Sequence, residues 1–376
     1  MSVPVPRSAW VTSTRQNDHV GEIVVITGAE LPLGRRLVRA ALTAEGIDRV
    51  VAVGSRPDPR GLTAKLETNA ELVVAPFKLD DSRLVPYLHD ATKVVLAGAR
   101  SGLDIDGSGG SDIDLGATRL FLSSLTSVAR VAQLVVISSA LVYGVRATNP
   151  VPLRESDPVR PDPEIQGAVE RAELERICRN WASGHGAHCA IMRPTVVVGP
   201  ENGKWLARSP WSTTGLQTSD EHTPVQFVHI DDVVSATLVA CQSRIDGALN
   251  VAPDGWITVK QVRELKGPTA RVRLARPFAH LIARLGERFG FALGHPDTVV
   301  ATSESWVVAN EKLRDLGWQA EYSHEEAYVE SDRGGPWARL TPRHRQNIAL
   351  GVAGVFAVAT AGTVAYFVRR HLRKPK

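Results

Sequence analysis

The sequence predicts an α/β fold: a doubly wound parallel sheet with a small C-terminal capping lobe, followed by one transmembrane helix. Three observations support this fold class. Short apolar, β-branched runs recur through the first half of the chain, helix-length stretches separate several of them, and 21 uncharged residues lie near the C-terminus. Continuous apolar runs are typical of strands that are covered on both faces, and such strands form parallel sheets.

Predicted strands and helices alternate through the first half of the chain. Six runs are predicted as strands: 22–28, 49–54, 71–76, 93–98, 133–139 and 189–194. Helices are predicted over 33–46, 114–132 and 163–183. This alternation is typical of a Rossmann-like sheet with helices on both faces. Beyond it the pattern becomes irregular, and we expect one domain over 21–332 whose substrate lobe lies mainly in 200–226 and 254–330.

The charge balance separates the body of the chain from its tail. The 376 residues contain 44 Lys and Arg and 40 Asp and Glu, a net charge of +4. Nine of the basic residues and none of the acidic ones lie beyond Asp332, which leaves 35 basic and 40 acidic residues in the body. An acidic body argues against a nucleic-acid-binding surface. The three cysteines have no metal-ligand or disulfide spacing, so we expect no metal site and a reduced compartment.

The residues Ile348–Val368 are predicted to form the transmembrane helix. At about 1.5 Å per residue, a helix of this length spans the roughly 30 Å hydrocarbon core of a bilayer. A basic linker, 333–347, precedes it, and a basic tail, 369–376, follows it. One face repeats a small residue at every fourth position, which favours pairing of helices in lipid and hence self-association, although alanine is also common in membrane spans generally. These residues are Ala353, Ala357, Ala361 and Ala365.

The expected location of the main domain follows from the N-terminal residues 1–20. They lack an apolar core of signal-peptide length, so we expect a mobile leader there and a domain that folds in the cytoplasm, held at the membrane by a single pass. The tail 369–376 carries more basic residues than the linker, and the positive-inside rule therefore favours a cytoplasmic tail. These two arguments point to opposite orientations.

Several short motifs occur in a fixed order along the domain. They are TGAELPLG (27–34), SSALVYG (138–144), RPTVVVGP (193–200), FVHIDDV (227–233), GALNVAPDG (247–255) and LGWQAEYSHEEAY (316–328). Together they resemble the extended short-chain dehydrogenases, also called the NAD-dependent epimerase/dehydratase family, over roughly residues 22–330. The resemblance implies a domain that binds a nicotinamide dinucleotide beside a substrate such as a nucleotide sugar.

The resemblance assigns the first turn, with its pattern T-G-x-x-G-x-x-G, to the dinucleotide. Gly28, Ala29 and Gly34 fall at positions that would hold the pyrophosphate. Leu31 replaces the middle glycine and would push the phosphates outward, while Glu30 would place a negative charge near them. The helix that follows still offers N–H groups and a dipole to an anion.

The second predicted strand ends without the acidic residue that, in the family, binds the ribose of NAD. Gly54, Ser55 and Arg56 stand there instead. With no carboxylate and with a guanidinium nearby, the sequence favours NADP over NAD as the cofactor. The alternative is that Arg56 is an ordinary surface residue on a turn.

The resemblance also implies which residues would carry the chemistry. The family uses a Ser or Thr hydroxyl and a Tyr-x-x-x-Lys pair on one helix face. Ser139 falls at the hydroxyl position, whereas alignment through ERAELERI puts Gly167 at the tyrosine position and Arg171 at the lysine position. No Tyr or Lys occurs between Gly144 and Gly203. Arg171 would still bind ribose hydroxyls, but an arginine does not exchange its proton near neutral pH.

The sequence leaves three functions open. The favoured one is a membrane-anchored module that binds a dinucleotide, a nucleotide sugar or a lipid-linked intermediate without the family's Tyr/Lys chemistry. The second is an active epimerase, dehydratase or oxidoreductase, in which another acid replaces the tyrosine and the substrate is a nucleotide sugar or a sterol-like molecule. The third is a structural domain that binds a protein partner and leaves its crevice empty.

Overall fold

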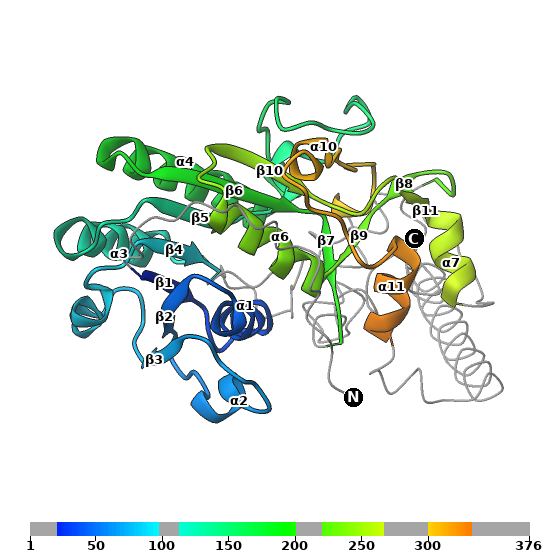
Figure 1. Ribbon diagram of the computed structural model, residues 1–376. Helices are drawn as coiled ribbons and strands as arrows, with labels where there is room; N and C mark the ends of the chain where they lie inside the picture. Colours follow the sequence, from blue (N-terminus) through cyan, green and yellow to red (C-terminus); the bar gives the residue numbers. More distant parts are fainter. Residues whose placement is uncertain (1–20, 98–112, 201–219, 267–299, 333–376) are drawn as a thin grey trace, which may run out of the picture.

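The computed structural model describes residues 21–97, 113–200, 220–266 and 300–332. Its main feature is a seven-stranded sheet in which all neighbouring strands are parallel (Figure 1). The strands are β1 (Glu22–Thr27), β2 (Ile47–Val53), β3 (Glu71–Ala75), β4 (Lys93–Leu96), β5 (Gln133–Ile137), β6 (His188–Pro194) and β10 (Gly247–Val251). They lie in the order β10–β6–β5–β4–β1–β2–β3, so the strand order reverses between β1 and β4. Sheets of this kind bind ligands at the carboxyl ends of the strands beside such a reversal.

Helices cover both faces of the sheet; they are α1 (Pro32–Thr43), α3 (Leu115–Val128), α4 (Gln166–His185) and α6 (Ile230–Gln242). α1 and α6 pack on one face, against side chains such as Val24 and Ile26 of β1. α3 and α4 pack on the other face, in the apolar cluster that contains Val25. Successive residues of a strand point to opposite faces, so a sheet covered on both sides needs apolar residues at every position.

The predicted doubly wound parallel sheet is confirmed. All six predicted strands occur in the sheet, and the three predicted helices correspond to α1, α3 and α4, with ends that differ by a few residues. The sequence did not predict the seventh strand, β10, which pairs with β6 at the edge of the sheet. It is only five residues long, and Asn250 interrupts its apolar run.

Most of the remaining elements follow the carboxyl ends of β5, β6 and β10 and share a second apolar cluster. They are η3 (Ala140–Tyr143), β7 (Val196–Val198), β8 (Pro224–Val225), β9 (Phe227–His229), β11 (Ile257–Thr258), α7 (Val259–Lys266) and α11 (His324–Asp332). In Figure 1, β8, β11, α7 and α11 lie on the opposite side of the molecule from α3. Three short helices complete the described structure: α2 (Pro59–Thr63), η2 (Ser82–Leu88) and α10 (Glu311–Arg314). The boundaries of the substrate lobe, 200–226 and 254–330, include residues outside the described part and stay a prediction.

Several predicted segments lie wholly outside the described residues. They are the leader 1–20, the linker 333–347, the transmembrane helix 348–368 with its alanine face, and the tail 369–376. Among the helices of the described ranges, none is long and apolar enough to cross a membrane. The membrane anchor and the proposed self-association therefore stay predictions from the sequence.

A buried carboxylate ties α6 to the C-terminal part of the described chain. Asp232 is 1% exposed, and its oxygens accept the backbone N–H groups of Glu321 at 2.8 Å and Tyr322 at 3.2 Å. Burial raises the pKa of Asp232 from its ordinary value of 3.8 to about 7. The folded protein therefore binds a proton at this group more tightly than the unfolded chain does.

The stability contributed by this proton is fully present below the unfolded pKa of 3.8 and is lost as the pH rises through 7. We expect Asp232 to reduce the free energy of unfolding by about 2–3 kcal/mol between pH 5 and pH 8, since one pKa unit corresponds to about 1.4 kcal/mol. Denaturant unfolding at the two pH values should show this loss in the wild type and not in Asp232→Asn. Equal pH dependence in the two proteins would mean that Asp232 does not titrate in this range.

Candidate functional site

The turn after β1 brings the backbone close to the N-terminus of α1. Gly28 has a φ of 68°, the left-handed conformation that glycine adopts without strain, and its carbonyl accepts the N–H of Leu31 at 2.8 Å. Gly34 packs directly on this turn, because a Cβ there would lie 2.1 Å from the Gly28 carbonyl oxygen. The two glycines thus serve the tight turn and the close contact of helix and strand, as the motif predicts.

The other residues of the turn differ from the family pattern. Leu31 is the N-cap of α1 with φ −84° and ψ 155°, so its backbone needs no glycine, and Pro32 follows at a position where a helix tolerates a missing N–H. Ala29 is buried and donates its N–H to the Val53 carbonyl at 3.0 Å. Ala29 therefore joins the turn to β2, and its N–H does not point to a phosphate.

An acidic side chain fills the space between this turn and the end of β2. Glu30 accepts the backbone N–H of Ser55 through Oε1 at 3.0 Å. A Cβ on Gly54 would lie 1.9 Å from Glu30 Oε2, so the carboxylate occupies the place where a side chain at position 54 would begin. Ser55 and Arg56 are exposed. The sequence predicts Glu30 near the phosphates, whereas the structure directs its carboxylate to the end of β2.

The carboxyl end of β5 carries Ser139, the predicted catalytic hydroxyl. This residue is the N-cap of η3, and its Oγ accepts the N–H of Leu141 at 3.2 Å. The side chain is buried. α4 packs beside η3, so Ser139 and the N-terminal part of α4 lie at the same edge of the sheet. Within the described residues the hydroxyl serves as a cap.

Ser139→Ala removes this cap, and we expect the free energy of unfolding to fall by about 1 kcal/mol, the usual value of such a cap. Ser127→Ala is the matched control, because Ser127 is exposed on α3 and its loss should change stability by less than about 0.5 kcal/mol. Denaturant midpoints of the two variants measure the difference. Equal midpoints would mean that the Leu141 N–H finds another acceptor.

α4 brings together the two residues at the predicted dyad positions. Gly167 lies in the first turn of the helix and Arg171 lies one turn later. Arg171 donates from Nη1 to the Gly167 carbonyl at 3.1 Å, and a Cβ on Gly167 would lie 3.1 Å from the same Nη1. Arg171 is buried, so its guanidinium covers the place from which a tyrosine side chain would begin. The helix offers neither a phenol nor an ammonium group at these two positions.

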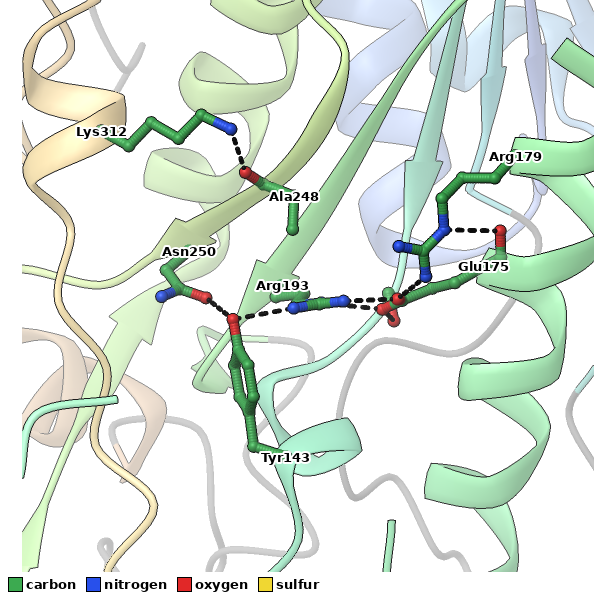
Figure 2. Close-up of polar contacts among 8 residues, drawn as sticks. Tyr143, Glu175, Arg179, Arg193, Ala248, Asn250 and Lys312 are labelled. Carbon is green, nitrogen blue, oxygen red and sulfur yellow. Dashed lines mark hydrogen bonds and ion pairs between the residues drawn. The ribbon is translucent and has the colours of Figure 1, made fainter. Parts of the chain in front are cut away.

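A buried polar network holds α4 against the sheet (Figure 2). Arg193 on β6 donates twice to Glu175 on α4, from Nε to Oε1 at 2.9 Å and from Nη2 to Oε2 at 2.7 Å. Ser138 and Arg179 donate to the same carboxylate at 2.6 and 2.8 Å. Arg193 is 2% exposed and Glu175 is 0% exposed. The network fixes the helix that carries the dyad positions relative to the ends of β5 and β6.

The network also assigns a structural role to Tyr143. Its hydroxyl accepts from Arg193 Nη1 at 2.8 Å and donates to Asn250 Oδ1 at 2.8 Å (Figure 2). Burial raises the pKa of Tyr143 to about 12. A phenol with this pKa stays protonated near neutral pH, far from the value that suits a general acid or base. Tyr143 is therefore not a substitute for the missing catalytic tyrosine.

Solved structures of other proteins share this fold. MoeE5 in complex with UDP-glucuronic acid and NAD has a TM-score of 0.61 and 20% identity, and the match covers 83% of this chain and 97% of that one. A UDP-glucose 4-epimerase from Thermotoga maritima, in complex with UDP-glucose, has a TM-score of 0.60 and 18% identity over 83% and 98% of the two chains. A UDP-N-acetylglucosamine 4-epimerase from Methanobrevibacter ruminantium has a TM-score of 0.61 and 17% identity, and the match covers 84% of this chain and 97% of that one.

The sequence itself gives the family. A comparison with curated proteins found no match. The model of the NAD dependent epimerase/dehydratase family, however, matches residues 24–252, which is more than half of the chain and includes the turn after β1, Ser139 and all of α4. With the parallel sheet and the glycine turn in place, the chain belongs to the NAD dependent epimerase/dehydratase family.

Proposed function

We propose that this protein is a membrane-anchored module that binds a nicotinamide dinucleotide and a nucleotide-sugar-like ligand without the proton transfer of the family's Tyr/Lys pair. The observation that carries the proposal is the pair on α4, where Gly167 and the Arg171 guanidinium take the two dyad positions. Glycine has no proton to give, and arginine keeps its proton at neutral pH. General acid–base catalysis is worth about 10²–10⁴-fold in rate, and this chain lacks the groups that supply it in the family.

The residues at the carboxyl edge of the sheet fit a dinucleotide. Gly28 and Gly34 keep the turn close to the start of α1, whose first turn contains no acidic residue and leaves the helix dipole available to a phosphate. The Glu30 carboxylate lies at the end of β2, where the adenosine ribose of a dinucleotide binds. When bound, the dinucleotide would supply a hydride donor or acceptor.

The class of the second ligand is supported by proteins of the same fold. MoeE5 was solved with UDP-glucuronic acid and NAD, and the Thermotoga maritima enzyme with UDP-glucose. A nucleotide sugar is therefore the ligand we propose beside the dinucleotide. The predicted preference for NADP rests on Gly54 and Arg56 alone, and the position of Glu30 argues against it.

The membrane anchor in this proposal is the segment 348–368, with the main domain on the cytoplasmic side. The anchor itself, as distinct from its orientation, is supported by the length of the uncharged segment and by its basic flanks. Deletion of residues 348–376 should move the protein from the membrane fraction to the soluble fraction. A deletion variant that stays with the membranes would reject the anchor.

Ligand-dependent thermal unfolding of the full-length protein in detergent tests the binding function. NAD, NADH, NADP and UDP-glucose are added separately at millimolar concentration. A ligand present at 100 times its dissociation constant stabilises the fold by about 2.7 kcal/mol, which raises Tm by several degrees. No shift with any of the four would reject the proposal and favour the partner-binding domain. A shift together with rapid conversion of UDP-glucose would favour an enzyme with a substituted acid.

A further inference from the structure

We infer that Glu30, in the turn after β1, is the residue that binds the adenosine ribose and selects NAD over NADP. The inference rests on the proposed dinucleotide function and names a residue that the family pattern does not use for this role. In Rossmann-type sites, an acidic residue that follows the second strand accepts hydrogen bonds from the ribose hydroxyls. The residue that follows β2 here is Gly54, which has no side chain.

The Glu30 carboxylate lies where a side chain at position 54 would begin. A Cβ on Gly54 would lie 1.9 Å from Glu30 Oε2 and 2.8 Å from its Cδ, so a side chain there would displace the carboxylate. The glycine at 54 leaves this space open, and an acid from the neighbouring turn takes the place of the acid missing after β2.

The Glu30 carboxylate has acceptor capacity to spare. Oε1 accepts the Ser55 N–H at 3.0 Å at the surface of the molecule, and this bond fixes the side chain over the end of β2. Oε2 is buried and has no hydrogen-bond partner among the residues that the structure describes. A carboxylate oxygen can accept more than one hydrogen bond, so the surface oxygen Oε1 can accept from a ribose hydroxyl beside the Ser55 N–H. The buried Oε2 would become available to the second hydroxyl only if the side chain rotated.

The charge of Glu30 discriminates between the two dinucleotides. NADP differs from NAD by a phosphate on the ribose 2′ oxygen, and a carboxylate at this position repels that phosphate while it attracts a hydroxyl donor. Two guanidinium groups oppose this effect. Arg35 donates from Nη2 to the Glu30 carbonyl oxygen at 3.3 Å, and Arg56 is exposed, where water and salt screen its attraction for the phosphate. The Glu30 carboxylate is held at the end of β2 by a backbone N–H, and we expect its repulsion of the 2′-phosphate to outweigh both.

The test is a titration of the full-length protein in detergent with NADH and with NADPH, followed by fluorescence or calorimetry. The wild type should bind NADH more tightly. Glu30→Gln keeps the shape of the side chain and removes its charge. We expect it to weaken the binding of NADH by about tenfold or more, as loss of a charge-assisted hydrogen bond does, and to leave the binding of NADPH no weaker. Glu45→Gln is the matched control, since Glu45 is exposed beyond the other end of α1, and it should leave both affinities unchanged.

A double variant separates loss of the acid from damage to the fold. Glu30→Ala with Gly54→Asp returns the acid to β2, and its NADH affinity should lie within about threefold of the wild type. An unchanged NADH to NADPH ratio in Glu30→Gln would overturn the inference. Tighter NADH binding by Glu30→Ala would also overturn the inference, because it would mean that the Glu30 side chain obstructs the dinucleotide. A wild type that binds neither dinucleotide rejects the proposed function itself, and the inference with it.

Discussion

Replacement of Glu175 by alanine should lower the free energy of unfolding by about 3–5 kcal/mol, the range found when one partner of a buried ion pair is removed. Two of the hydrogen bonds of the Arg193 guanidinium go to Glu175, and the third that the structure records goes to the Tyr143 hydroxyl. Arg193 is 2% exposed, so water does not replace the lost carboxylate. Denaturant unfolding of the full-length protein measures the effect.

The matched control is Glu173→Ala on the same helix. Glu173 forms ion pairs with Arg119 at 2.8 Å and Arg176 at 2.7 Å, but the arginine side chains are about half exposed. Exposed pairs contribute about 0–1 kcal/mol, so this variant should lose less than about 1 kcal/mol. Similar losses in the two variants would mean that the Arg193–Glu175 pair is hydrated and does not fix α4.

The second large effect is a gain. The double variant Gly167→Tyr with Arg171→Lys restores the family's Tyr-x-x-x-Lys spacing on α4, and we expect it to raise the conversion of UDP-glucose to its 4-epimer, with NAD present, by about 10²-fold or more. Both changes belong together, because the family's acid is a tyrosine paired with a lysine, and a Cβ on Gly167 would lie 3.1 Å from the Arg171 guanidinium. Chromatography of the nucleotide sugars measures the product.

The control for this gain is Gly167→Phe with Arg171→Lys, which has the same ring without the hydroxyl. It should bind the same ligands and stay as slow as the wild type. If the tyrosine variant binds NAD and UDP-glucose but converts UDP-glucose no faster than the wild type, the missing Tyr/Lys pair is not what limits the epimerisation rate of this chain. Ligand-dependent melting of all three proteins shows whether binding has survived.

The fold was accessible from the sequence because the signal is local. Strands buried on both faces need apolar residues throughout, and six such runs with helices between several of them specify a doubly wound sheet. β10 was missed because Asn250 breaks its short run, and the reason for that asparagine lies elsewhere in the chain: its side chain accepts from the Tyr143 hydroxyl, 107 residues away.

The site was predictable only in part, because the positions of some of its side chains depend on residues far away in the sequence. The glycine turn, Ser139 and the dyad positions follow from motifs, and the structure brings them to the carboxyl edge of the sheet. The direction of Glu30 depends on Ser55, 25 residues further on, and no local pattern shows it. The Arg193–Glu175 pair could have been inferred only in part from the sequence. Arg193 stands near the end of the apolar strand CAIMRP, and a charged residue in such a strand needs a buried partner.

The central claim, that this chain binds family ligands without family proton transfer, is tested most directly by one turnover measurement. Full-length protein in detergent is saturated with NAD and UDP-glucose, binding is verified by calorimetry, and the 4-epimer is followed over hours. We expect both ligands to bind and turnover to stay below about 0.1 s⁻¹, two or more orders of magnitude under the typical enzyme value of about 10 s⁻¹. Turnover above about 1 s⁻¹ by homogeneous wild-type protein would contradict the claim.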